Sequence, residues 1–331
     1  MKKILITGAT GFIGSHLAEE MIKNKEKIRV FVKDKKNLGN LDDIGKDNLE
    51  KLDIVEGDLL NKKTLDNAMK NITKVFHVAA ISRPMNIPKK KYYEINVNGT
   101  KNLLESCKKN NVKKIILISS MSVFGYSRRG EIINESSPKN PVTDYGESKK
   151  QQEEFALDFC KKNKIKMVGI RPPMVFGERD MQFFKLFKGI KTGFFPLLKN
   201  GKARFEFCYV KNLIHGILLA DKKGRNLEIY NITDGKTYTI KEVFEKIARY
   251  ENTRLIKMPA WVFKSCGWVM EKTYALAGKK SPFNSGTAEW MTNDNIRDIN
   301  KAKKELGYKQ KVKIDESLKQ TIKWYREKGY L

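Results

Sequence analysis

Short runs of β-branched and aliphatic residues alternate along the chain with longer segments in which apolar residues recur every three or four positions. The short runs predict strands and the longer segments predict amphipathic helices, because each periodicity matches one regular structure. The predicted strands are residues 4–7, 28–32, 54–56, 74–78, 114–119 and 167–171, and the predicted helices are 13–23, 62–69, 92–110 and 144–162. Such alternation is typical of a parallel sheet with helices on both faces. We therefore predict a doubly wound α/β domain.

The regular alternation ends after Arg171, where two prolines stop the last predicted strand and glycines become frequent. A further predicted strand, 228–232, rejoins the sheet, whereas the chain from residue 233 onward is mostly helical in pattern. We therefore expect a cofactor domain and a smaller, mostly helical substrate lobe. The expected cofactor domain is 1–177 together with about 207–232, and the expected lobe is 178–206 with 233–331.

Charge and cysteine content narrow the class of protein. The 331 residues carry 66 Lys and Arg against 38 Asp and Glu, a net charge of +28, but the lysines are dispersed and lack an accompanying cluster of arginine and aromatic residues. We interpret them as solvated surface and expect no nucleic-acid partner. The four cysteines are far apart and form no ligand pattern with the three histidines, so we expect no metal and a reduced, cytoplasmic setting.

A glycine-rich segment links the first predicted strand to the first helix. It reads Thr7-Gly8-Ala9-Thr10-Gly11-Phe12-Ile13-Gly14. In a dinucleotide-binding turn the first glycine permits a tight turn, the second lets the backbone approach a pyrophosphate, and the third lets the helix pack on the strand. We therefore predict NAD or NADP as cofactor. The predicted contacts in this segment are Gly8, Thr10, Gly11, Phe12, Ile13 and Gly14.

The residue after the second strand indicates which cofactor is bound. An acid at this place contacts the ribose of NAD, and a basic residue suits the 2′-phosphate of NADP. Lys33 stands here and favours NADP, whereas the adjacent Asp34 keeps NAD open. Asp58 and Leu59 follow the third strand, where they would lie beside the adenine; Asp58 also suits a helix N-cap.

A candidate catalytic group follows the fifth strand. Ser120 directly follows that strand, and Tyr145 and Lys149 lie four residues apart, on one face of the next predicted helix. A nearby ammonium group and a positive nicotinamide ring would favour the phenolate of the tyrosine, which could then exchange a proton with the substrate. We predict that Ser120 holds the substrate oxygen during hydride transfer.

These motifs together resemble the extended short-chain dehydrogenase/reductases, which include NAD-dependent epimerase/dehydratases and 3β-hydroxysteroid dehydrogenases. The resemblance covers nearly the whole chain and implies a Rossmann fold. It places the segment His77-Val-Ala79-Ala80 along the cofactor, makes Asn96 a structural and proton-relay residue, and puts Pro172 in the loop under the nicotinamide. By the same resemblance, Tyr145 and Lys149 contact the cofactor as well as the substrate.

Two departures concern the substrate. Nucleotide-sugar enzymes of this superfamily usually have an asparagine where this chain has Met174, and an arginine one position closer to the following tyrosine-valine pair than Arg204. A one-residue shift in an extended segment turns a side chain to the other face, although a bulge could restore its direction. Both changes favour a less charged, steroid-like or flavonol-like substrate. Ser82, Ser122, Met174 and Arg204 are the predicted substrate contacts.

Three hypotheses for function remain. The first is an NAD(P)-dependent oxidoreductase that interconverts a secondary alcohol and a ketone. The second is a nucleotide-sugar epimerase similar to UDP-glucose 4-epimerase, which would hold NAD tightly and return the hydride to the same molecule. The third is a cofactor-binding protein without catalysis, against which the joint presence of Ser120, Tyr145 and Lys149 argues.

Two surface questions complete the predictions. The segment 259–278 is predicted as a helix whose charged side carries Trp261 and Trp268. We favour their packing under a loop of the same lobe over peripheral contact with a membrane. The helices 92–110 and 144–162 would pair in a homodimer if the apolar residues Phe155, Leu157 and Phe159 face a second copy rather than the sheet.

Overall fold

The computed structural model describes residues 3–82, 87–127, 131–193, 195–198, 201–276 and 293–331. Its strands are β1 (Lys3–Thr7), β2 (Ile28–Val32), β3 (Asp53–Glu56), β4 (Ile72–His77), β5 (Lys114–Ile118), β6 (Lys166–Arg171), β7 (Met174–Phe176), β8 (Leu197–Leu198), β9 (Arg204–Tyr209), β10 (Glu228–Asn231), β11 (Thr237–Thr239) and β12 (Lys257–Met258). Its α-helices are α1 (Phe12–Lys23), α2 (Lys46–Leu49), α3 (Lys62–Met69), α4 (Lys89–Tyr92), α5 (Gly99–Lys109), α6 (Asp144–Lys162), α7 (Met181–Lys191), α8 (Val210–Lys223), α9 (Ile240–Tyr250), α10 (Ala260–Leu276) and α12 (Ile314–Glu327). Shorter 3₁₀ turns are η1 (Gly39–Ile44) and η3 (Met121–Val123), and π-helical turns are η2 (Tyr93–Asn98) and η5 (Ala302–Leu306).

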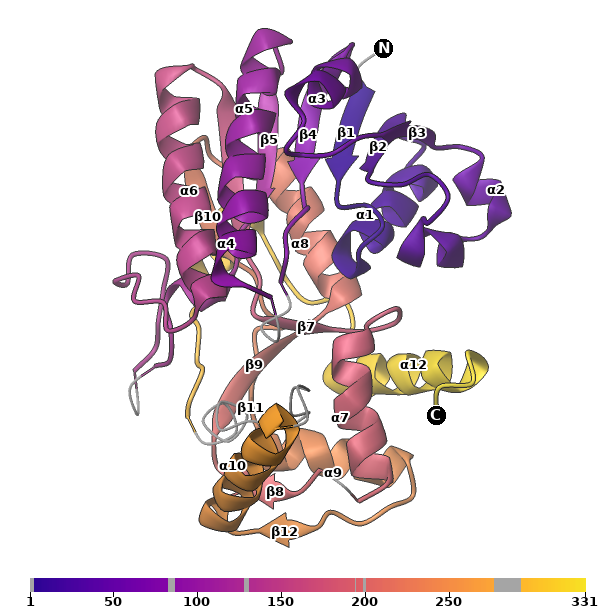
Figure 1. Cartoon of the computed structure of the whole chain (residues 1–331), viewed down its shortest axis with the longest axis vertical. Coiled ribbons are helices and arrows are strands. Elements are labelled where there is room, and N and C mark those ends of the chain that lie inside the picture. Colours follow the sequence, from indigo (N-terminus) through magenta and orange to yellow (C-terminus); the bar gives the residue numbers. More distant parts are fainter. Residues whose placement is uncertain (1–2, 83–86, 128–130, 194, 199–200, 277–292) are drawn as a thin grey trace.

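Seven parallel strands form the central sheet, in the order β10-β6-β5-β4-β1-β2-β3 (Figure 1). The chain leaves β1 toward β2 on one side and returns to β4 on the other, so the strand order reverses between β1 and β4. In open α/β sheets a ligand binds at the carboxyl ends of the strands beside such a reversal. The predicted Rossmann-type α/β fold is confirmed, and β10 pairs with β6 as the last strand of the sheet.

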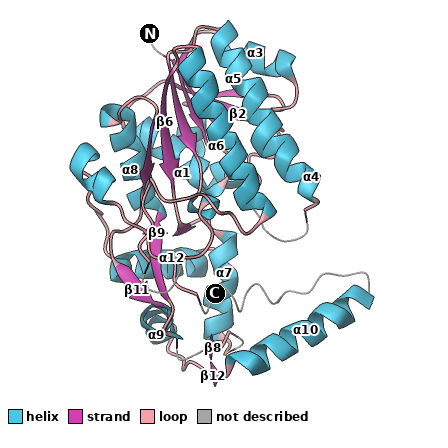
Figure 2. Ribbon diagram, turned by 90° about the vertical axis from the view of Figure 1, so that its left-hand side faces the viewer, coloured by secondary structure: helices cyan, strands magenta, loops and turns pink. Residues whose placement is uncertain are grey.

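Helices cover both faces of the sheet because its strands are apolar on both sides. On one face, α3, α5 and α6 enclose a core that includes Leu65, Leu103 and Ala156; on the other, α1 and α8 contribute Leu17 and Leu213 to a core that continues into the second lobe (Figure 2). The apolar residues of α6 considered for a dimer are only half-buried and pack against the first of these cores. A homodimer therefore stays a prediction.

The second lobe lies below the carboxyl ends of the main strands (Figure 1). It is built on a small sheet of order β11-β9-β7, in which β9 runs parallel to β7 and antiparallel to β11. Helices α7, α9 and α12 pack around it, and α10 follows the short pair β8-β12 at its far end. Residues 277 and 278, where the predicted last helix ended, lie outside the described residues.

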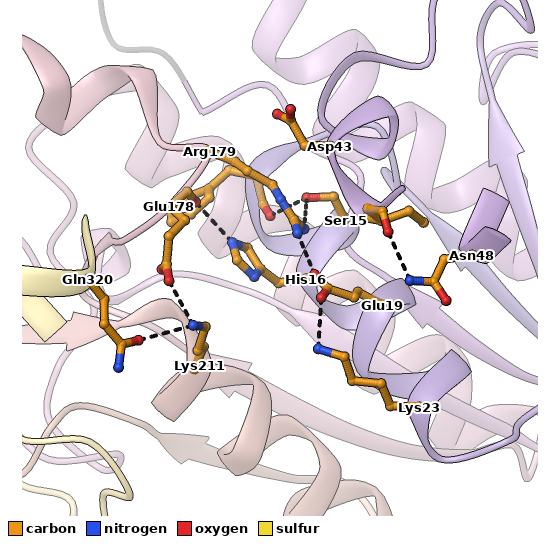
Figure 3. Close-up of polar contacts among 12 residues, drawn as sticks. Ser15, His16, Glu19, Lys23, Asp43, Asn48, Glu178, Arg179, Lys211 and Gln320 are labelled. Atoms are coloured by element: carbon orange, nitrogen blue, oxygen red, sulfur yellow. Dashed lines mark hydrogen bonds and ion pairs between the residues drawn. The ribbon is translucent and has the colours of Figure 1, made fainter. Parts of the chain in front are cut away.

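Polar contacts join the two lobes at α1 (Figure 3). The loop after β7 carries Glu178 and Arg179, and Arg179 reaches Ser15 and forms an ion pair with Glu19. The His16 ring nitrogen Nε2 lies 2.9 Å from the Glu178 carbonyl oxygen, and burial, with the nearby Arg179 charge, lowers the pKa of His16 to about 4. His16 is therefore neutral at pH 7, and its ring forms a hydrogen bond that joins α1 to the loop after β7.

The same cluster extends into the C-terminal helix. The Glu178 carboxylate accepts hydrogen bonds from Tyr209 and from Lys211, at 2.8 and 2.7 Å, and Lys211 also donates to Gln320 of α12 at 3.1 Å. Elements from three distant parts of the sequence are thus tied to the helix that begins at the glycine turn. The relative position of the two lobes depends on these bonds.

We expect Arg179→Ala to lower the free energy of unfolding by about 3 kcal/mol, because Arg179 is 8% exposed and its loss leaves Glu19 without its inner partner. The matched control is Lys23→Ala, which removes the other cation on Glu19; its side chain is 57% exposed, and a cost below about 1 kcal/mol is expected. Urea denaturation of both variants measures the difference. Equal losses of unfolding free energy in the two variants would show that the buried Arg179–Glu19 ion pair stabilises the fold no more than the exposed Lys23–Glu19 pair does.

Candidate functional site

The glycine turn lies where the sheet reverses its order. Gly8 has a φ of +73°, and a Cβ atom there would lie 2.6 Å from the backbone of Ala79 at the end of β4. Only glycine combines this left-handed conformation with so close an approach. The turn after β1 and the segment after β4 therefore share one narrow crevice at the carboxyl ends of their strands.

The N-terminus of α1, which follows the glycine turn, can bind an anion. Gly11 is the N-cap of α1 and brings no side chain to the free N–H groups of the first turn. At Gly14 a Cβ atom would lie 2.1 Å from the Gly8 carbonyl oxygen, so the helix start is pressed against the turn. Unpaired N–H groups and a helix dipole favour a phosphate at this place. The residues present, with Thr10, Phe12 and Ile13 between these glycines, fit the pyrophosphate of a dinucleotide.

The predicted adenosine-end residues also lie together. Lys33, directly after β2, is 3.6 Å from the Asp58 carboxylate and its side chain is 84% exposed. Asp34 uses one carboxylate oxygen to accept the Lys36 N–H at 2.8 Å. Leu59 is buried, and its carbonyl oxygen accepts a hydrogen bond from Asn102. A basic group thus stands free of the backbone where the ribose of a dinucleotide would end, while the neighbouring acid is engaged in a local turn.

Ser120 and Tyr145 meet at the carboxyl end of β5. Ser120 is 7% exposed, and its hydroxyl oxygen accepts the Ser122 N–H at 3.1 Å, which caps the turn η3. The main-chain N–H of the next residue donates to the Pro172 carbonyl oxygen at 3.0 Å, which fixes this turn to the loop after β6. Burial raises the pKa of Tyr145, a hydrogen bond with Ser120 lowers it, and the Tyr92 ring raises it further.

Lys149 lies one helical turn below Tyr145 and is 1% exposed. Its ammonium group donates to the Ile118 carbonyl oxygen at 2.7 Å. Burial lowers the pKa of Lys149 to about 7, although the Glu153 charge acts in the opposite direction. The effect of Lys149 on the Tyr145 pKa stays a prediction; in the ligand-free protein burial favours the neutral form of both side chains.

Asn96 holds the segment after β4 against the catalytic helix. Its side-chain oxygen accepts the Ile81 N–H at 2.8 Å, and its amide donates to the Ile81 carbonyl at 3.1 Å and to the Ser148 hydroxyl at 2.9 Å. The π-helical turn η2, which interrupts the single helix predicted for 92–110, brings Asn96 to this position. Such turns often occur at functional sites. Asn96 therefore ties the segment after β4 to α6, and its role as a proton relay stays a prediction.

His77 does not line the crevice. It is buried, with its two ring nitrogens 2.7 Å from the Thr7 hydroxyl and 2.8 Å from the Thr100 hydroxyl. Burial, with the nearby Lys149 charge, lowers the pKa of His77 to about 3, so the ring is neutral. The expectation for His77 is corrected: it joins β1 to α5 below the crevice. Ala79 and Ala80 beyond it are half-buried at the crevice, where a ligand could touch them.

Sequence reasoning missed the carboxylate that supports the catalytic helix. Glu153 is fully buried and accepts hydrogen bonds from Ser119 and from the Arg171 Nε, each at 2.8 Å, and lies 2.9 Å from the Lys139 ammonium. Burial raises its pKa, but the Arg171 and Lys139 charges outweigh this and hold the pKa below its usual value. Glu153 follows Lys149 by four residues, so the same spacing that pairs Tyr145 with Lys149 could have identified it.

The predicted substrate residues are only partly brought together. Ser122 is half-buried and accepts a hydrogen bond from the Ser120 hydroxyl at 3.1 Å, and Met174 is half-buried at the start of β7. Ser82 is exposed just beyond the segment that Asn96 holds. Arg204 lies at the far end of β9 and pairs with Asp294, with 2.7 Å between Nη2 and Oδ2. The Arg204 guanidinium is therefore already balanced by a carboxylate.

Fold and site together define an enzyme-like dinucleotide-binding protein of the extended short-chain dehydrogenase/reductase class. Residues 4–233 match the model of the NAD dependent epimerase/dehydratase family, and the chain belongs to this family. Its relatives include both dehydrogenases and epimerases.

Two curated relatives illustrate this range. The chain is 28% identical to human sterol-4-alpha-carboxylate 3-dehydrogenase, decarboxylating, over 98% of this chain and 88% of the relative. It is also 28% identical to an N-acetyl-alpha-D-glucosaminyl-diphospho-ditrans,octacis-undecaprenol 4-epimerase of Escherichia coli O157:H7, over 85% of this chain and 83% of that protein. Among solved structures, UDP-glucuronic acid 4-epimerase from Bacillus cereus, in complex with NAD, shares the fold with a TM-score of 0.78 and 24% identity, over 98% of this chain and 99% of that one.

The buried Lys149 predicts a specific pH dependence of stability. Its folded pKa is about 7 and its unfolded pKa 10.5, so between these values the unfolded chain binds more protons and the free energy of unfolding rises with pH. Relative to Lys149→Met, the ligand-free wild type should gain up to about 1.4 kcal/mol per pH unit between pH 7 and 10. Urea denaturation at several pH values measures this. Lys161→Met, at the exposed end of α6, is the control, and a flat difference for Lys149→Met would refute the shift.

Proposed function

We propose that this protein is an NAD(P)-dependent oxidoreductase that interconverts a secondary alcohol and a ketone. The observation that carries the proposal is the hydrogen-bonded pair of Ser120 and Tyr145, with Lys149 buried one turn below, beside a crevice that fits a dinucleotide. A hydroxyl that can hold an oxygen and a phenol that can exchange its proton are what alcohol oxidation or ketone reduction requires. Membership of a family of NAD-dependent enzymes supports this assignment.

Each residue then has a distinct task. Ser120 donates a hydrogen bond to the substrate oxygen, and Tyr145 takes the hydroxyl proton in oxidation or returns it in reduction. The bound nicotinamide would accept or supply the hydride. Lys149 contacts the ribose and, when protonated, stabilises the Tyr145 phenolate. Asn96 positions the catalytic helix through Ser148.

The substrate is proposed to be apolar around the reacting carbon. Met174 presents a thioether at the position where nucleotide-sugar enzymes usually have an amide, and the Arg204 charge is balanced by Asp294. Both features reduce the attraction for a diphosphate. The similarity to a sterol-carboxylate dehydrogenase supports a steroid-like alcohol or another apolar alcohol.

A second candidate is an epimerase that acts on a sugar attached through a diphosphate to a lipid. The relative from Escherichia coli O157:H7 carries this activity in its name and matches most of the chain. The same residues would serve, but the hydride would return to the substrate that gave it. The two candidates share an apolar substrate portion and differ in whether the reduced cofactor accumulates.

Incubation with sterol alcohols and with lipid-linked diphosphosugars tests both candidates. Release of reduced nicotinamide, followed by its absorbance, supports the oxidoreductase, whereas sugar isomerisation without net reduction supports the epimerase. Tyr145→Phe should lower kcat by about 10²-fold or more, because it removes the group that exchanges the proton. Tyr93→Phe, which removes a hydroxyl from a neighbouring helical turn, should leave kcat within a few-fold. Full turnover by Tyr145→Phe would overturn the assigned role.

The NADP preference is proposed from Lys33, whose exposed ammonium, 3.6 Å from the Asp58 carboxylate, could pair with a 2′-phosphate instead. Lys33→Ala should weaken NADPH binding by about tenfold, the scale of a lost charged hydrogen bond, and leave NADH binding nearly unchanged. Titration calorimetry with both cofactors measures the ratio, and Lys63→Ala, on the exposed surface of α3, controls for the general loss of a charge. If Lys33→Ala kept the wild-type ratio of affinities, the preference would not depend on Lys33.

A further inference from the structure

Exposed apolar side chains are concentrated at one end of the second lobe. Among the described residues, the large apolar side chains that are exposed number eleven, and six of them lie between residues 256 and 276. Four of these six are Trp261, Trp268, Val269 and Leu276 of α10, which are 71%, 60%, 50% and 90% exposed. The expectation that the two tryptophans pack under a loop is wrong. Figure 2 shows α10 reaching away from the rest of the lobe.

These four side chains occupy one face of α10. At 100° per residue they fall within an arc of about 100°, together with Ser265 and Lys272. The opposite side holds Phe263, which is buried in the main core, and the half-buried Met270. The helix is therefore held to the lobe through Phe263, whereas Tyr274 on the same side is 37% exposed, and the four side chains form an apolar face that is open to the surroundings. Ordinary surface helices of globular proteins have their apolar and polar faces the other way round.

The segment that contains α10 is rich in basic residues. Between residues 254 and 276 the sequence has four basic residues, Arg254, Lys257, Lys264 and Lys272, against the single acid Glu271, and the whole chain carries +28. The Lys272 ammonium lies 5.9 Å from the centre of the Trp268 ring, so a cation stands beside one of the two exposed tryptophans. A tryptophan face with basic flanks suits the interface of an anionic bilayer, where the rings enter the headgroup region and the cations meet phosphates.

We propose that α10 docks this protein on the surface of an anionic phospholipid bilayer, with Trp261, Trp268, Val269 and Leu276 entering the headgroup region. No helix among the described residues is long and apolar enough to cross a membrane, so contact through one face is the mode that the structure supports. This surface is separate from the Ser120–Tyr145 site. Docking needs neither cofactor nor substrate, and it stands or falls independently of the proposed reaction.

Vesicle flotation of the full-length, ligand-free protein tests the proposal. Vesicles of phosphatidylcholine with phosphatidylglycerol are compared with pure phosphatidylcholine at physiological and at high salt. Wild type should bind the anionic vesicles, and Trp261→Ala/Trp268→Ala should bind at least tenfold more weakly, although its charge is unchanged. The double variant Ile132→Ala/Val142→Ala, which removes exposed apolar groups elsewhere, should bind as wild type does. Equal thermal midpoints ensure that all three proteins are folded.

Three results would overturn the proposal. The first is absence of wild-type binding to anionic vesicles, and the second is equal binding by the tryptophan variant, which would assign the effect to net charge alone. The third is a dimer of wild type in solution that the tryptophan variant loses, observed without vesicle binding, since a second copy would then cover the face. Trp261→Phe/Trp268→Phe should keep most of the binding, because the aromatic surface remains.

Discussion

A buried carboxylate, Glu153, holds α6, the helix that carries Tyr145 and Lys149, in place. Ser119 at the end of β5, Arg171 at the end of β6 and Lys139 from the preceding loop all converge on it. A fully buried charge is tolerated only when its partners are complete, so the helix, the two strand ends and the loop must be correctly placed together. Since Lys149 and Tyr145 are one and two turns away from Glu153 on the same helix, their positions follow from these contacts.

Tyr145 and Lys149 are shielded from water in the ligand-free protein. Lys149 and Tyr145 both have pKa values moved toward their neutral forms, chiefly because burial removes them from water. His77 below them is neutral for the same reason. In such surroundings a single added charge acts strongly, because little water is present to screen it. The protonation of Tyr145 and Lys149 is therefore expected to respond to any charged ligand that binds against them.

The two lobes meet around the helix that begins at the glycine turn. Glu178 and Arg179 reach α1 from the loop that follows β7, and the same β7 carries Met174 toward the crevice. These polar contacts thus link the position of α1 to that of the second lobe. Helix α10 lies at the other end of the lobe, well away from this junction (Figure 1).

The sequence was sufficient for the sheet and for the centre of the site because those features depend on local signals. Strand and helix periodicities are short-range signals. The glycines at 8, 11 and 14 are required by steric contacts within one turn, and Tyr145 and Lys149 share a face because of helix geometry alone. The Rossmann-type fold, the family and the gathering of Ser120 with Tyr145 were all predictable on this basis.

Features that depend on contacts between distant segments were decided only by the tertiary structure. Nothing near Glu153 in the sequence indicates that Arg171 and Lys139 will contact it. His77 points into the core because its ring forms hydrogen bonds with the Thr7 and Thr100 hydroxyls there. The π-helical turn at Asn96 and the pairing of Arg204 with Asp294 have the same origin. The sequence located Trp261 and Trp268 on one helix, but their exposure depends on what packs beside that helix, which periodicity does not encode.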